Sequence, residues 1–168
     1  FFGKNNMSLR ELLNALRETY CGTLGAEYMY TTEQAEKRWW QQKLESIRSK
    51  PNFGADKKKQ ILDRLTAAEG LERYLHTKYV GQKRFSLEGG ESFIAAMDEL
   101  IQQAGLKGVQ EVVIGMAHRG RLNVLVNTMG KLPSDLFAEF DHTAPEDLPA
   151  GDVKYHQGFS SDVNTAGG

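Results

Sequence analysis

The sequence is poor in several features that would each point to a particular class of protein. Its single cysteine, Cys21, cannot form an internal disulfide, which fits a reducing compartment. The 21 lysines and arginines nearly balance the 22 aspartates and glutamates, so the basic excess of a dedicated nucleic-acid-binding domain is missing. No apolar run reaches the ~20 residues that cross a bilayer. We therefore expect neither a nucleic acid nor a membrane as a partner.

The two ends of the chain also lack the features of natural ends. The chain begins at Phe1 without an initiator methionine or a signal-peptide pattern, and it stops at Gly168 within a glycine-rich run. We therefore expect an internal fragment of a longer protein.

Helical periodicity is the main feature of residues 1–80. Ser8 and Glu11 have the spacing of a capping box at a helix start, and apolar residues follow at helical spacing. Two more helical stretches come before residue 80. The second of these contains Gly70, so it is either one helix or two helices that meet there. We predict a mainly helical region over residues 1–80.

The pattern changes in residues 81–168. Residues 111–116 are almost continuously apolar, as expected for a buried parallel strand. A polar turn follows, and residues 122–129 return to helical spacing. Strand, turn and helix in this order form one unit of an α/β sheet, so we predict an α/β fold that begins after residue 80 and is incomplete at residue 168.

The turn after the predicted strand, His118-Arg119-Gly120-Arg121, contains the residues best suited to binding or catalysis. Ligands of open α/β sheets bind beyond the carboxyl ends of the strands. Arginine binds phosphate or carboxylate through paired donors, histidine exchanges protons near neutral pH, and glycine lets the backbone approach a ligand. A solvated basic turn with a capping histidine would have the same residues, so the pattern alone leaves both interpretations open.

Two further segments allow two interpretations each. Residues 154–161 place His156 and Ser160 in a glycine-containing loop, where they contact a ligand or anchor the loop by packing. Phe85, in the run 84–90, is by itself typical of a core residue. A resemblance to a known family bears on both segments.

Several long motifs occur in an order that resembles one family. They occupy residues 20–29, 36–39, 67–75, 84–90, 115–125 and 151–156. From about residue 9 to its end, the chain resembles the thiamine diphosphate-dependent component of the 2-oxoglutarate dehydrogenase complex and its decarboxylase relatives. The resemblance implies that residues 81–168 begin the α/β domain that binds the cofactor.

The family implies an enzyme of the tricarboxylic acid cycle, an oxidoreductase that uses thiamine diphosphate with Mg²⁺. The cofactor attacks the ketone carbon of 2-oxoglutarate, carbon dioxide leaves, and the succinyl unit passes to a lipoyl group on a partner succinyltransferase. Members of the family are usually homodimers. Residues 84–90 are closer to the bacterial relatives, so we expect a bacterial cytoplasm, with the mitochondrial matrix as the alternative.

The resemblance also implies roles for individual residues. His118 and His156 would lie at the carboxylates of the substrate, and Phe85 would pack beside the reacting carbon. Ser160 would be a polar contact in the same catalytic site, and Arg121 would bind the cofactor diphosphate.

Other residues receive no catalytic role from the resemblance. Arg119 either contributes to the site or pairs within the scaffold, and Tyr30 stands where relatives have histidine in a helical region. The Gly-Asp…Asn metal motif and the glutamate that activates thiamine are expected beyond residue 168. We therefore assign no metal ligand here and expect residues 1–168 alone to be inactive.

Alternative functions stay open. A relative that uses 2-oxoadipate, or a stand-alone 2-oxoglutarate decarboxylase, would share these motifs. A non-catalytic module could instead use the arginine turn to bind a phosphate or a carboxylate of a partner protein.

Overall fold

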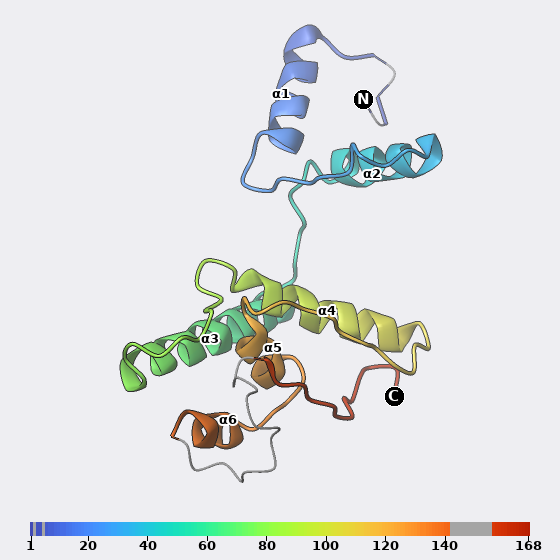
Figure 1. Cartoon of the computed structure of the whole chain (residues 1–168). Coiled ribbons are helices and arrows are strands. Elements are labelled where there is room, and N and C mark those ends of the chain that lie inside the picture. Colours follow the sequence, from blue (N-terminus) through green and yellow to red (C-terminus); the bar gives the residue numbers. More distant parts are fainter. Residues whose placement is uncertain (2, 5, 142–155) are drawn as a thin grey trace. The chain divides into compact units, whose positions relative to one another are not determined.

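The computed structural model describes residues 1, 3–4, 6–141 and 156–168. Two compact units, Phe1–Gly54 and Ala55–Gly168, are described separately below. Six helices make up the regular secondary structure of the described residues (Figure 1): α1 (Leu9–Tyr20), α2 (Gln34–Ser46), α3 (Ala55–Lys78), α4 (Ser92–Leu106), α5 (Arg121–Asn127) and α6 (Pro133–Phe140). None of these helices is long and apolar enough to cross a membrane.

The first unit is built on α1 and α2, and the predicted capping box starts α1. The Ser8 hydroxyl accepts a hydrogen bond from the Glu11 N–H, and the Ser8 N–H donates to the Glu11 carboxylate at 2.8 Å. The backbone hydrogen bond from Ser8 lowers the pKa of Glu11. The Tyr20 hydroxyl donates to the carboxylate of Glu45, near the end of α2, at 2.8 Å. The helical prediction is therefore confirmed for this unit.

The second unit is organised around α3, which packs against α4 and α5. Helix α3 runs without interruption through Gly70, so the predicted stretch is one helix and not two. Its buried face contributes to two apolar clusters. The first consists of Leu71, Leu75, Tyr79, Leu122, Leu136 and Phe140, and the second of Ala68, Leu87, Ile94 and Val124.

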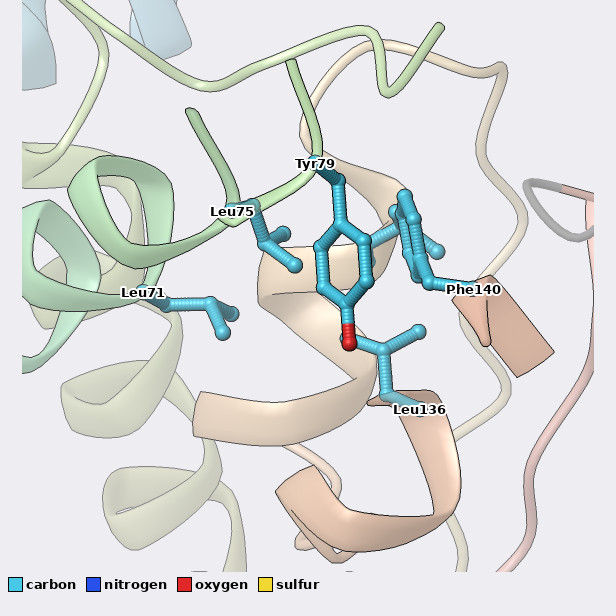
Figure 2. Close-up of a cluster of buried hydrophobic side chains, with 6 residues drawn as sticks. Leu71, Leu75, Tyr79, Leu136 and Phe140 are labelled. Atoms are coloured by element: carbon cyan, nitrogen blue, oxygen red, sulfur yellow. The ribbon is translucent and has the colours of Figure 1, made fainter. Parts of the chain in front are cut away.

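Figure 2 shows the first cluster, in which the Tyr79 ring lies between Leu75 and Phe140. The rings of Tyr79 and Phe140 are 4.7 Å apart. Burial of this cluster joins the end of α3 to α6, while the second cluster joins the middle of α3 to α4 and α5. Together the clusters hold in place the turns that precede α4 and α5.

The predicted strand over residues 111–116 is not formed. The described residues contain no strand, and Val112 and Val113 are 42% and 86% exposed. A strand is stabilised by ladder hydrogen bonds to a neighbouring strand, and the described residues offer none. The helical part of the predicted fold is therefore confirmed, whereas the parallel sheet is absent from these residues.

The boundary between the two compact units differs from the change in sequence pattern. The units separate after Gly54, so α3 belongs to the second unit, although the sequence grouped it with the helical region 1–80. Helix α3 belongs there because it supplies residues to both apolar clusters of that unit. The division at residue 80 concerns the complete cofactor domain and stays a prediction.

Candidate active site

Three of the residues singled out from the sequence form a stacked column of rings. The Phe85 and His118 rings are 5.0 Å apart at an interplanar angle of 27°, and the His118 and His156 rings are 4.5 Å apart at 28°. Nε2 of His156 lies 2.9 Å from Nδ1 of His118, so one imidazole donates a hydrogen bond to the other. The fold thus brings together three segments that are far apart in the sequence.

Both imidazoles of this column are exposed, and Phe85 is half-buried. A ligand can therefore reach the histidines, while the phenyl ring shields one face of His118. Each imidazole has a second ring nitrogen outside the hydrogen bond between the two rings, and an N–H at that nitrogen can donate to an anionic oxygen. The arrangement is suited to holding a carboxylate or a developing oxyanion.

The backbone of Phe85 adopts a left-handed conformation, with φ of 46°. For a residue other than glycine this costs about 1–2 kcal/mol, so the surrounding structure has to hold it. The Phe85 carbonyl accepts a hydrogen bond from the Gly120 N–H at 2.9 Å. The Arg119 guanidinium donates to the Ser86 carbonyl at 3.0 Å. Arg119 therefore contacts the scaffold through a carbonyl and ties the Phe85 turn to the His118 turn.

Glycine is required at position 120 for two reasons. Gly120 has φ of 73°, and a Cβ atom there would lie 2.6 Å from Cδ1 of the buried Leu87. Gly120 also immediately precedes α5. The sequence had suggested that glycine allows a ligand to approach, whereas the structure shows that it allows Leu87 to approach.

Arg121 connects the His118 turn to the segment that carries His156. Its Nε donates to the Gln157 carbonyl at 2.8 Å, one terminal nitrogen to the Met116 carbonyl at 2.9 Å, and the other to the His156 carbonyl at 3.0 Å. Three of the five N–H donors of the guanidinium are thus directed at the chain itself. Arg121 therefore holds His156 in register with His118, and its contact with a diphosphate stays a prediction.

Replacing Arg121 by lysine is expected to loosen the segment that carries His156. A single ammonium group cannot reproduce the planar fork that reaches three carbonyls. Losing about 2 kcal/mol of charge-assisted hydrogen bonding would raise the population of detached conformations of residues 157–161 by roughly 30-fold. Limited proteolysis followed by mass spectrometry measures cleavage in this segment. Arg73→Lys on the exposed surface of α3 is the matched control, and unchanged cleavage in Arg121→Lys would contradict this role.

Two buried charged residues near the column were missed by sequence reasoning. Lys131, 9% exposed, donates to the Glu139 carboxylate at 2.8 Å and to the Gln157 side chain at 2.6 Å. Glu72, 3% exposed, accepts a hydrogen bond from the Leu87 N–H at 3.0 Å. The sequence signals for Glu72 are its place within the motif over residues 67–75 and on the apolar face of α3.

Ser160 is not joined to the column by the contacts that unite the other three residues. It is exposed, and its neighbour Ser161 instead donates to the Met129 carbonyl. Over the part of the chain that the structure describes, no three His, Cys, Asp or Glu side chains lie close enough to hold a metal ion.

Comparison with known proteins identifies the family. A relative from Cupriavidus necator is 79% identical over 168 residues, one from Azotobacter vinelandii is 56% identical over 168 residues, and one from Haemophilus influenzae is 50% identical over 163 residues. Each is named 2-oxoglutarate dehydrogenase E1 component. The chain belongs to the 2-oxoglutarate dehydrogenase E1 component family. The resemblance found in the sequence motifs is thereby confirmed.

The chain matches only a part of each of these E1 components. It spans 18% of the length of the first two relatives and 17% of the third, and no family model matches it. The stacked column therefore lies in a chain that corresponds to a small part of these relatives.

Proposed function

We propose that the full-length protein carrying this chain decarboxylates 2-oxoglutarate with thiamine diphosphate and transfers the succinyl unit to a lipoyl group of a partner succinyltransferase. The observation that carries this proposal is the pair of hydrogen-bonded imidazoles, His118 and His156, within a chain 79% identical to a 2-oxoglutarate dehydrogenase E1 component. A dicarboxylic oxo acid presents anionic oxygens that two adjacent imidazoles can hold.

In this proposal the chain supplies the substrate side of the site. His118 and His156 donate hydrogen bonds to carboxylate oxygens and stabilise the charge that develops at the reacting oxygen. Phe85, which stacks on His118, excludes water from one side of that ring. Ser160, exposed four residues after His156, adds a polar contact once substrate is bound.

The cofactor side of the proposed site rests on Arg121. Thiamine diphosphate, when bound, supplies the carbanion chemistry. The Arg121 guanidinium has more N–H donors than the three carbonyls it contacts, so it can also donate to a diphosphate oxygen while holding the His156 segment. We place the Mg²⁺ ligands and the thiamine-activating glutamate in other segments of the full-length protein.

We also propose that residues 111–116 become a strand in the full-length protein. Val112 and Val113 are exposed, and neighbouring parallel strands would cover them and pair their backbone groups. Residues 81–168 would then begin the α/β cofactor domain. A homodimer in the bacterial cytoplasm completes the proposal, in line with the bacterial relatives.

The proposal is tested by carbon dioxide release from the full-length protein. We expect release from 2-oxoglutarate that depends on thiamine diphosphate and Mg²⁺, and none from residues 1–168 alone. Faster release from 2-oxoadipate would favour that substrate instead, and release without transfer to a lipoyl group would indicate a stand-alone decarboxylase. No cofactor-dependent release from either oxo acid would favour a non-catalytic anion-binding module.

A further inference from the structure

The buried carboxylate of Glu72 lies where three parts of the second unit meet. Its Oε1 accepts hydrogen bonds from the Leu87 N–H at 3.0 Å and from the Asn123 amide at 3.1 Å. Its Oε2 lies 3.9 Å from Nε of Arg84. Glu72 thus links α3 to the turn before α4 and to α5.

Burial of Glu72 is energetically expensive, which calls for a reason for its presence. Removing a carboxylate from water costs several kcal/mol, and an apolar side chain of similar volume is often equal or better for stability. Its neighbours on α3, Leu71 and Leu75, belong to an apolar cluster. A charge at this position is therefore more easily explained by the geometry it imposes than by stability.

The geometry that Glu72 imposes is that of the turn carrying Phe85. Arg84 directly precedes Phe85, and Leu87 follows it by two residues, so the carboxylate holds the turn on both sides of the strained residue. Leu87 in turn lies against Gly120, whose N–H donates to the Phe85 carbonyl. The Glu72 carboxylate is therefore placed to fix the path of the turn that carries Phe85.

The contact between Glu72 and Arg84 is incomplete. Oε2 of Glu72 and Nε of Arg84 are both buried and have no hydrogen-bond partner among the described residues, although they lie only 3.9 Å apart. An approach of about 1 Å would give a normal hydrogen bond. Arg84 is also held by Glu88, at 2.7 Å, within the same turn.

We propose that Glu72 is a positioning residue for the column formed by Phe85, His118 and His156. Its carboxylate holds the turn so that the Phe85 ring stays stacked on His118, and His118 stays aligned with His156. Glu72 itself touches no ring of the column in the contacts described. The expected effect of Glu72 on turnover rests on the proposed function. The effect of Glu72 on His118 can be measured without catalysis.

The test compares Glu72→Leu and Glu72→Gln in the full-length protein. Leucine removes the charge and both hydrogen bonds, so kcat is expected to fall by ~10²-fold while KM changes little, as for a misplacement of about 1 Å. Glutamine keeps an acceptor for the Leu87 N–H and is expected to restore roughly a tenth of the turnover or more. Glu69→Gln, one turn away on the exposed surface of α3, is the matched control.

A second readout needs no catalysis. Carbethoxylation of His118 by diethyl pyrocarbonate, followed by peptide mass spectrometry, is expected to accelerate several-fold in Glu72→Leu, with the exposed His76 on α3 as internal reference. An unchanged His118 rate in a folded Glu72→Leu variant would overturn the proposal. If that variant does not fold, Glu72→Met decides, because methionine has a similar length and no hydrogen-bonding carboxylate. An unchanged His118 rate in Glu72→Met overturns the proposal, and a faster rate supports it.

The two readouts also separate the two proposals. If the unsubstituted protein releases no carbon dioxide from any 2-oxo acid, the proposed function fails. The carbethoxylation rates then still decide whether Glu72 positions His118.

Discussion

Replacing His118 by alanine in the full-length protein is expected to lower turnover of 2-oxoglutarate by ~10²-fold or more, as is typical when an electrostatic stabiliser is removed. His118 is the middle ring of the column, so its loss removes one hydrogen-bond donor and also the partner that orients His156. The measurement is kcat from carbon dioxide release at saturating substrate. Near-normal turnover would remove His118 from the mechanism.

Two further variants sharpen this experiment. His76→Ala changes an exposed histidine on α3 and is expected to leave turnover unchanged. His156→Ala combined with His118→Ala is expected to cost little more than either change alone, because the two imidazoles share one hydrogen bond. Fully additive losses would indicate that the two histidines act independently.

The sequence was sufficient for features that depend on local interactions. The capping box at Ser8 and Glu11 needs only residues three apart, and it forms as predicted. Helix α3 keeps its apolar spacing through Gly70, and the structure shows one helix there. Local periodicity alone left open whether one helix or two cover this stretch. The packing of α3 decides it, because the cost of glycine in a helix, roughly 1 kcal/mol, is small compared with that packing.

The strand prediction stays unconfirmed because a strand depends on its neighbours. Residues 111–116 have the composition of a buried strand, but ladder hydrogen bonds require a second strand that the described residues do not supply. The same limit applies to the partners of Arg121. Its sequence context indicated an anion, whereas the donors meet three carbonyls, two of them 35 and 36 residues away in the chain.

The candidate active site combines residues that the sequence indicated with residues that it did not. Family motifs placed Phe85, His118 and His156 in one site, and the structure brings their rings into contact. The motif over residues 67–75 contains Glu72 but assigned it no role, and Lys131 lies in none of the motifs. The role of a charged residue among apolar ones is explained only by the groups that surround it after folding. The residues that hold the column are thus harder to find from sequence than the column itself.

Replacing Gly120 by alanine is expected to lower the stability of the second unit around α5. The left-handed backbone costs alanine about 1–2 kcal/mol. The new Cβ would lie 2.6 Å from Cδ1 of Leu87, which is packed with Ala68, Ile94 and Val124. Overpacking of this kind adds about 1–3 kcal/mol, so the opening free energy of the α5 amides is expected to fall by about 2–5 kcal/mol. Hydrogen–deuterium exchange of the full-length protein measures this change.

Two glycine variants isolate the clash in that experiment. Gly130 has φ of 80°, and a Cβ atom added there would meet no atom of the described residues within 4 Å, so Gly130→Ala should show only the backbone cost of about 1–2 kcal/mol. Gly70, inside α3 and equally open, should gain about 0.5–1 kcal/mol as alanine. Equal losses in Gly120→Ala and Gly130→Ala would show that Leu87 moves aside freely. The turn that carries Phe85 would then be more compliant than the contact between Leu87 and Gly120 implies.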